Sequence, residues 1–99
     1  MQIDVILNGE RKHLDMRSLK GKEVDKIIKK LMELESATDE TKLKAYQEYS
    51  ELQKEYASKI SGLSVEDLDE LDIDDRNKIY QYMGKKVSDS MGFGMPSSQ

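Results

Sequence analysis

The sequence predicts a small, mainly α-helical protein of the α+β class, with a short N-terminal β-hairpin packed on a bundle of three to four helices. Three observations support this: apolar residues alternate before an Asn-Gly pair, apolar residues recur at helical spacing over most of the remaining chain, and the last ten residues carry no charge. A chain of 99 residues supports one modest core. We therefore expect one domain over residues 1–89 and a flexible tail over residues 90–99.

Residues 2–16 are predicted to form the hairpin. Ile3, Val5 and Leu7 alternate with other residues, and Asn8-Gly9 follows at once. Both central positions of a type I′ turn need a positive φ, which Asn and Gly tolerate, so the return strand is expected at residues 10–16. Two strands alone are marginal in water, so the hairpin must lie against a helix.

The clearest helical pattern predicts a first helix over residues 21–35. Its apolar residues fall at i, i+3, i+4 and i+7: Val24, Ile27, Ile28, Leu31, Met32 and Leu34. We expect this face to form the centre of the core, with Leu31 buried in it.

A second helix is predicted over residues 39–61, capped by Thr38 or Asp39. At 1.5 Å per residue it extends about 33 Å, longer than a compact domain of this size needs, so part of it is expected to project. Its core stripe is Ala45, Tyr49, Leu52, Tyr56 and Ile60, while Leu43 and Tyr46 lie to one side.

Five residues are candidates for binding a partner. Tyr46, Tyr49 and Tyr56 of the second helix either form the edge of the core or line a partner-binding face, because tyrosine is enriched at interfaces. The core-edge interpretation is favoured, and both stay open. Met91 and Phe93 are apolar residues within the uncharged tail, which either stays disordered or becomes ordered on a partner.

The stretch from Gly62 to Asp75 combines a helix-start signal with seven acidic residues and no basic one. Gly62 is expected to close the second helix, and Ser64 to cap a short helix over residues 65–71, with Asp67 reaching back as in a capping box. We expect Leu68, Leu71 and Ile73 to face the core. Asp74 is expected to cap the last helix, over residues 75–88. The apolar spacing in that helix involves Ile79, Tyr82, Met83, Lys86 and Val87.

Charge argues against nucleic acid as a partner. The net charge is −4, with 12 basic and 12 acidic residues in residues 1–60 but 4 and 8 in residues 61–99. Nucleic-acid binding needs an excess of Lys and Arg, and one local basic run is better explained as a solvated helix face. Its members are Arg17, Lys20, Lys22, Lys26, Lys29 and Lys30.

Other functional classes lack their signals. There is no cysteine, no signal peptide and no apolar run of the roughly 18 residues that span a bilayer, so we expect a cytoplasmic protein without membrane contact. His13 has no nucleophile beside it. The acidic stretch fails as a calcium loop, because Arg76 or Leu71 occupies a ligand position and the turn glycine is missing. We expect no enzyme, no metal and no cofactor.

The order of these parts resembles a known family. An Asn-Gly hairpin, an amphipathic helix, a long polar helix and the run GLSVEDLDELDIDD before a final helix are similar to the tail assembly chaperones of long-tailed bacteriophages and prophages. The resemblance covers residues 2–88.

The resemblance implies a non-catalytic protein in the cytoplasm of the bacterial host. It would bind the tape-measure protein, a long helical rod that sets tail length, and help to recruit subunits of the tail-tube protein. The implied contact surface is the uncovered apolar part of the first two helices, with Met91 and Phe93. Two alternatives remain: a structural tail or head-tail joining subunit retained in the virion, or a small helical adaptor protein.

Overall fold

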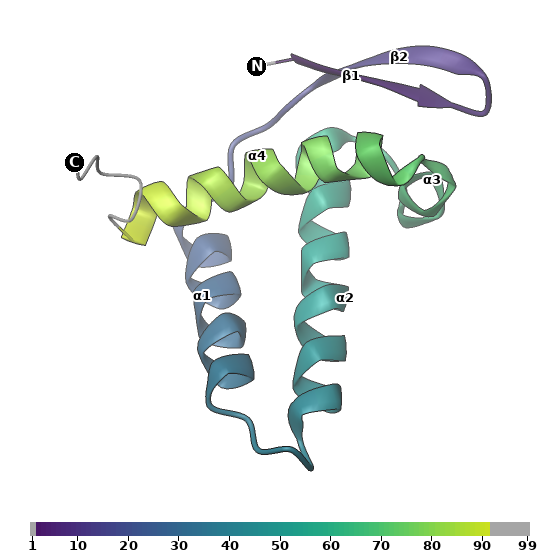
Figure 1. The fold of residues 1–99 in the computed structure, drawn as a ribbon. Helices are drawn as coiled ribbons and strands as arrows, with labels where there is room; N and C mark the ends of the chain where they lie inside the picture. Colours follow the sequence, from purple (N-terminus) through teal and green to yellow (C-terminus); the bar gives the residue numbers. More distant parts are fainter. Residues whose placement is uncertain (1, 92–99) are drawn as a thin grey trace.

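A computed structural model describes residues 2–91, with side chains through residue 90, as a two-stranded hairpin packed against four helices (Figure 1). This confirms the predicted fold class. The elements are β1 (Gln2–Leu7), β2 (Glu10–Asp15), α1 (Gly21–Glu35), α2 (Lys42–Ser61), α3 (Val65–Glu70) and α4 (Ile73–Met91). Residues 92–99, most of the predicted flexible tail, lie outside the described residues.

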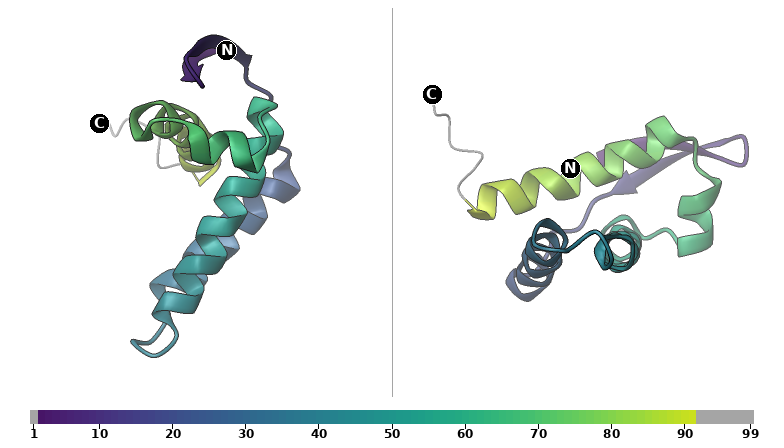
Figure 2. Two further views of the ribbon diagram at one scale, coloured as in Figure 1. Left: turned by 90° about the vertical axis from the view of Figure 1, so that its right-hand side faces the viewer. Right: turned by 60° about the horizontal axis from the view of Figure 1, so that its bottom comes forward.

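The molecule has two parts, a head and an arm. α4 crosses the ends of α1 and α2, and the hairpin lies at the same end, above α4 in Figure 1. The head consists of the hairpin, α3, α4 and the adjoining ends of α1 and α2. The arm is the rest of α1 and α2, which run antiparallel away from α4 (Figure 1) and lie side by side in the right-hand view of Figure 2.

The hydrophobic core lies entirely in the head. α1 contributes only residues from its first two turns, and α2 only residues from its last two turns. The buried apolar residues are Ile3, Val5, Leu7, Leu14, Met16, Val24, Ile27, Tyr56, Ala57, Ile60, Leu63, Leu68, Leu71, Ile79, Met83 and Val87. The arm is therefore a pair of helices that pack on each other without a third layer.

This arrangement corrects the expectation for α1. Leu31 and Ile28 are half-buried, and Met32 is 63% exposed, so the predicted central face lies mostly beside the core. The reason is geometric: α4 crosses only the first part of α1, and the rest of α1 has α2 as its neighbour within the described residues.

Ile73 was expected to face the core, and this prediction is wrong. The buried stripe of α4 runs at i, i+4, i+8 through Ile79, Met83 and Val87. Ile73, at the first helical position, points away from that stripe and is 58% exposed. Leu68 and Leu71 are buried as expected.

Two predicted helix starts are also wrong. Residues 38–41 form a turn in which the Thr41 N–H donates to the Thr38 carbonyl (3.1 Å) and the Thr41 hydroxyl accepts the Thr38 N–H (3.0 Å), so α2 begins only at Lys42. At the other joint, the Asp72 carbonyl accepts the Arg76 N–H (3.0 Å), which places Asp74 inside the first turn of α4. α4 also continues past residue 88 and is described through Met91.

The signals around residues 62–64 behave as predicted. Gly62 ends α2 in the left-handed conformation, with φ of 81°. Ser64 caps α3, because its hydroxyl accepts the Asp67 N–H at 3.1 Å. The second hydrogen bond of a capping box, from the Ser64 N–H to the Asp67 carboxylate, is not found within the described residues. Only one of the two bonds of the box is therefore present.

The outer edge of β1 is partly closed by α4. In a hairpin with a two-residue turn, Leu7 and Glu10 form the first hydrogen-bonded pair, so alternate residues Gln2, Asp4 and Ile6 direct their backbone groups away from β2. The Ile6 N–H donates to Asp75 Oδ2 (2.9 Å), and Lys78 Nζ donates to the Asp4 carbonyl (3.0 Å). We call Asp75 and Lys78 the edge clamp.

The edge clamp is an ionic unit. Lys78 Nζ lies 3.0 Å from Asp75 Oδ1, and the Asp75 side chain is only 14% exposed. The hydrogen bond from the Ile6 N–H, and then the contact with Lys78, lower the pKa of Asp75 below its ordinary value. The first turn of α4 adds the positive end of the helix dipole, which also favours a carboxylate there.

Core position should determine the cost of truncating a side chain. We expect Ile79→Ala to lower the free energy of unfolding by about 2–5 kcal/mol, because Ile79 is fully buried. Leu31→Ala should cost about 1 kcal/mol, because that side chain is only partly buried. Urea denaturation followed by circular dichroism measures both. Equal losses would contradict the placement of the core in the head.

The edge clamp should make the free energy of unfolding depend on pH in the acidic range. A carboxyl group whose native pKa is lowered contributes stability that is complete above its unfolded pKa, about 3.9, and is lost as the pH falls through the native pKa. Asp75→Ala should therefore destabilise the protein by about 1–3 kcal/mol at pH 7 and by progressively less below pH 4.

Asp74→Ala is the matched control, since Asp74 is an exposed carboxylate in the same turn without a hydrogen bond to the hairpin. The pKa of Glu23 is also lowered, by the hydrogen bond from the Lys20 N–H. Glu23 is present in both variants, so its contribution to the pH dependence of stability is the same in each. Urea midpoints from pH 7 to pH 2.5 provide the comparison. If the two variants lose the same stability at every pH, the clamp does not hold the hairpin.

Candidate functional site

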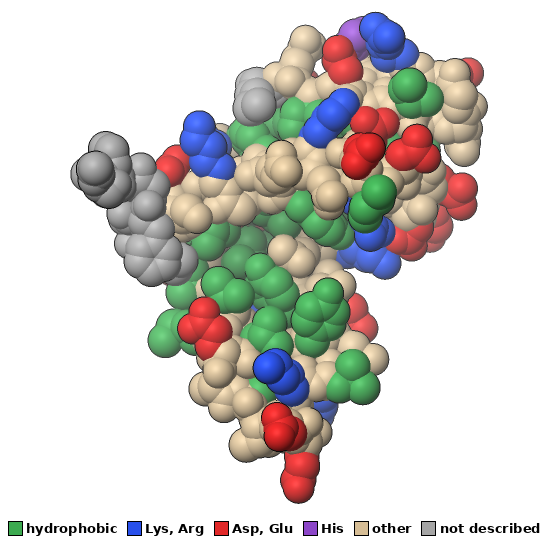
Figure 3. Space-filling model, viewed as in Figure 1, with side chains coloured by type: hydrophobic (Ala, Val, Ile, Leu, Met, Phe, Trp, Pro, Cys, Tyr) green, Lys and Arg blue, Asp and Glu red, His purple; other side chains and the backbone are tan. Residues whose placement is uncertain are grey.

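An uncovered apolar face follows the arm and the adjoining part of α4. Figure 3 shows hydrophobic side chains gathered over α1, α2 and the underside of α4 on the side in view. We call this surface the apolar face. Its exposed or half-buried members are Leu31, Leu43, Tyr46 and Tyr49, and it borders the core residues Ile27, Met83 and Val87 at the bottom of a notch.

The deepest part of the apolar face is a notch where the three helices meet. The notch has a volume of about 170 Å³ and is lined by Ile27 and Leu31 of α1, Tyr49 and Gln53 of α2, and Met83, Gly84, Val87 and Ser88 of α4. An apolar cavity of about 150 Å³ is large enough to bind benzene. The notch therefore has room for one large apolar side chain.

Tyr49 is held at the wall of the notch. Its side chain is half-buried, and its hydroxyl accepts a hydrogen bond from Gln53 Nε2 at 3.2 Å. Burial raises the pKa of Tyr49 above its ordinary value, so the phenol is neutral at physiological pH. Its ring offers apolar surface to the notch while its polar group already has a partner.

Along α2 the apolar face continues away from the notch. Tyr46 lies one turn before Tyr49, and Leu43 one turn before Tyr46. Tyr46 is 59% exposed and Leu43 is 70% exposed. Large neighbouring apolar side chains left this open are typical of a surface that another molecule covers.

The structure separates the three candidate tyrosines. Tyr46 and Tyr49 lie on the apolar face, whereas Tyr56 lies in the core of the head and is 2% exposed. A partner would reach Tyr56 only after the core had opened. Met91 is the last residue of α4 and its side chain lies outside the described residues, as does Phe93.

The residues of α4 that line the notch were missed as candidates from the sequence. Met83 and Val87 carry the same spacing as any core-facing pair, so nothing in the sequence marks them as lining an opening. Gly84 is the one available signal, because a glycine inside a helical pattern costs stability and often has a packing reason. Here the missing side chain leaves the notch open.

An ion-pair cluster joins the two helices of the arm. Lys30 Nζ of α1 lies 3.3 Å from a carboxylate oxygen of Glu33 and 3.3 Å from one of Glu48 on α2. The hydrogen bonds to Glu33 and then Glu48 raise the pKa of Lys30. This contact connects α1 to α2 beyond the reach of α4.

The lining of the notch is mostly apolar. Its lining contains one phenol, one amide and one hydroxyl among apolar groups. Within residues 2–90, no three His, Asp or Glu side chains gather closely enough to hold a metal ion. None of the four helices described combines the length and the apolar composition needed to cross a bilayer.

Comparison of the chain with protein-family models, with curated proteins and with solved structures found no match.

Glycine substitutions should distinguish the two conformations that this chain gives its glycines. Gly84 has helical backbone angles, and a Cβ added there meets no atom within 4 Å, so Gly84→Ala should raise the free energy of unfolding by about 0.5–1 kcal/mol. Gly62→Ala should lower it by about 1 kcal/mol or more, because φ is positive there. Thermal and urea denaturation measure both. A destabilised Gly84→Ala would mean that α4 packs more closely there than described.

Proposed function

We propose that this protein is a non-catalytic phage tail assembly chaperone, which binds the tape-measure protein and helps to recruit tail-tube subunits in the cytoplasm of the bacterial host. The observation that supports this most is the apolar face, with its notch where α1, α2 and α4 meet. The order of hairpin, helices and acidic joint supports the choice of family.

The apolar face suits an amphipathic helix. Such helices bind in grooves through apolar anchors at i, i+3 or i+4, and i+7. Leu43 and Tyr49 lie six residues apart, or about 9 Å along α2. A partner helix laid along the arm would place one anchor in the notch and others on Tyr46 and Leu43, covering about two of its own turns.

The rest of the molecule suits a holder of apolar helices. A long tape-measure protein exposes apolar stripes until the tail tube surrounds it, and an acidic companion keeps such a complex soluble. This chain carries a net charge of −4 and seven acidic residues between Gly62 and Asp75. The core stays in the head, so covering the arm does not require the fold to open.

Co-expression with the tape-measure protein of the same genome tests the proposal. Tyr46→Ala and Leu43→Ala should each reduce the amount of chain retained on tagged tape-measure protein by about 5- to 30-fold, the range expected for central anchors. Ile73→Ala is the matched control, since Ile73 is as exposed as Tyr46 but lies on the head. It should bind like the unchanged chain.

A substitution at Gly84 separates loss of binding from loss of fold. Gly84→Leu places a side chain at the notch, so it should weaken retention while thermal denaturation shows a folded protein. Retention unaffected by Tyr46→Ala, Leu43→Ala and Gly84→Leu would exclude the apolar face as the binding surface. Mass spectrometry of purified virions completes the test, because a structural subunit appears there at ring or tube stoichiometry and a chaperone does not.

A further inference from the structure

The edge clamp engages two of the six outward-facing backbone groups of β1, the Asp4 carbonyl and the Ile6 N–H. The Ile6 carbonyl on one side of the clamp has no hydrogen-bond partner within residues 2–90. The Gln2 N–H, Gln2 carbonyl and Asp4 N–H on its other side also have none there, and this half of the edge is open. An unpaired strand edge is a template for another strand, and proteins usually cover or blunt it.

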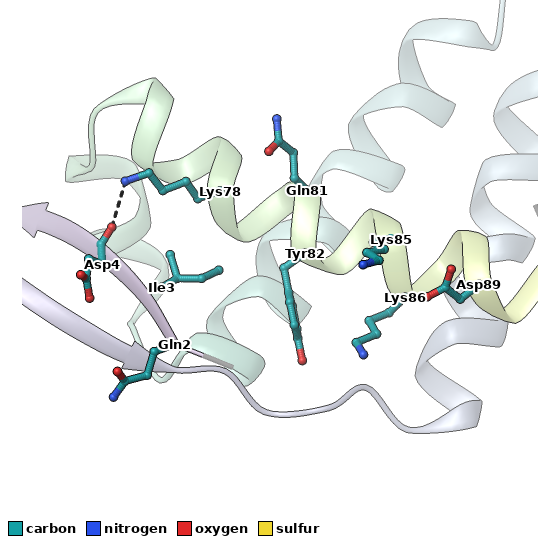
Figure 4. A pocket seen from close by; sticks show the side chains of 9 residues that line it. All are labelled: Gln2, Ile3, Asp4, Lys78, Gln81, Tyr82, Lys85, Lys86 and Asp89. Atoms are coloured by element: carbon teal, nitrogen blue, oxygen red, sulfur yellow. Dashed lines mark hydrogen bonds between the residues drawn. The ribbon is translucent and has the colours of Figure 1, made fainter. Parts of the chain in front are cut away.

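This open half of the edge faces a cavity of about 530 Å³, three times the size of the notch. We call it the edge groove. β1 forms one wall and α4 the other, and Figure 4 shows Lys78 at the end where it bonds to Asp4. Tyr82 and Lys86 extend side by side from α4, with Lys86 Nζ 5.5 Å from the centre of the Tyr82 ring.

Of the charged side chains along the edge groove, two lysines form no contact with a carboxylate. The Asp4 carboxylate is hydrogen-bonded to His13 Nδ1, and Lys78 pairs with Asp75. Lys85 and Lys86 are exposed and form no ion pair within the described residues. Lys85, Lys86 and Asp89 lie together on α4, with Tyr82 between them and β1 (Figure 4), so this end of the edge groove carries a net charge of +1.

We propose that the edge groove binds an extended, acidic segment of a partner protein, which adds to β1 as a third strand. The main chain of the segment would pair with the free groups of Gln2 and Asp4, as in other cases of strand addition. A carboxylate of the segment would lie against Lys85 and Lys86, and an apolar side chain against the Tyr82 ring. A helix cannot use the open edge, because its own backbone groups are already bonded.

A second copy of the chain fits this edge less well than a free segment does. Pairing two β1 edges would bring the two α4 helices against each other, because each α4 already covers half of its own edge. The edge groove involves neither Tyr46 nor Tyr49, so this inference does not depend on the function proposed for the apolar face.

The probe is a synthetic peptide, acetyl-Thr-Val-Glu-Val-Glu-Thr-amide, titrated into the untagged, ¹⁵N-labelled protein. We expect chemical-shift changes at the backbone of Gln2 and Asp4 and at Lys85 and Lys86, and slower hydrogen exchange of the Asp4 N–H. A peptide with lysine in place of both glutamates tests charge. A peptide methylated on alternate backbone nitrogens tests strand pairing.

Protein variants locate the charge effect. The double variant K85E/K86E should weaken binding by tenfold or more, and K26E/K29E, with the same change in net charge on the exposed side of α1, should weaken it by less than threefold. Shift changes that map to the arm, equal binding of the methylated peptide, or equal weakening by both double variants would each overturn the proposal. So would the absence of any shift change at millimolar peptide.

Discussion

The packing of α4 against the rest of the chain is the constraint on which the other features depend. Ile79, Met83 and Val87 recur every fourth residue, which buries one narrow stripe of a helix of 19 residues. This stripe covers the ends of α1 and α2, and the first turn of α4 holds the hairpin. Because α4 is long and its buried stripe narrow, it also borders both open surfaces, the notch on one side and the edge groove on the other.

The hairpin has little stability of its own and depends on its contacts with the helices. Ile3, Val5 and Leu7 bury one face, but β2 contributes only Leu14 to that face. Two strands with so little shared apolar surface are not stable alone. The polar contacts of Asp75 and Lys78 with the edge of β1 complement this burial and also fix where the hairpin sits along α4. A hydrophobic surface alone would leave that position free to slide.

Local signals in the sequence predicted most of the fold. The Asn8-Gly9 turn, the start of α1 at Gly21, the end of α2 at Gly62 and the cap at Ser64 each depend on residues adjacent in the chain. The exposure of Leu31 and Ile73 was not predictable in this way, because an amphipathic pattern shows which face is apolar and not how far its neighbours extend. The same limit explains the tyrosines: Tyr49 and Tyr56 share a stripe on α2, yet only Tyr56 is enclosed in the core.

The two-helix arm has a consequence for how firmly it holds a ligand. Beyond the notch, the backbone of α1 and α2 is supported by one helix-helix contact and by ion pairs such as that of Lys30. We therefore expect the arm to open locally at a lower free energy than the head does. A ligand that binds the arm would reduce this local opening, and the conformational entropy lost on binding would lower its affinity. Under the function proposed above, a helix bound on the arm would therefore be held less tightly than the same helix bound on the head.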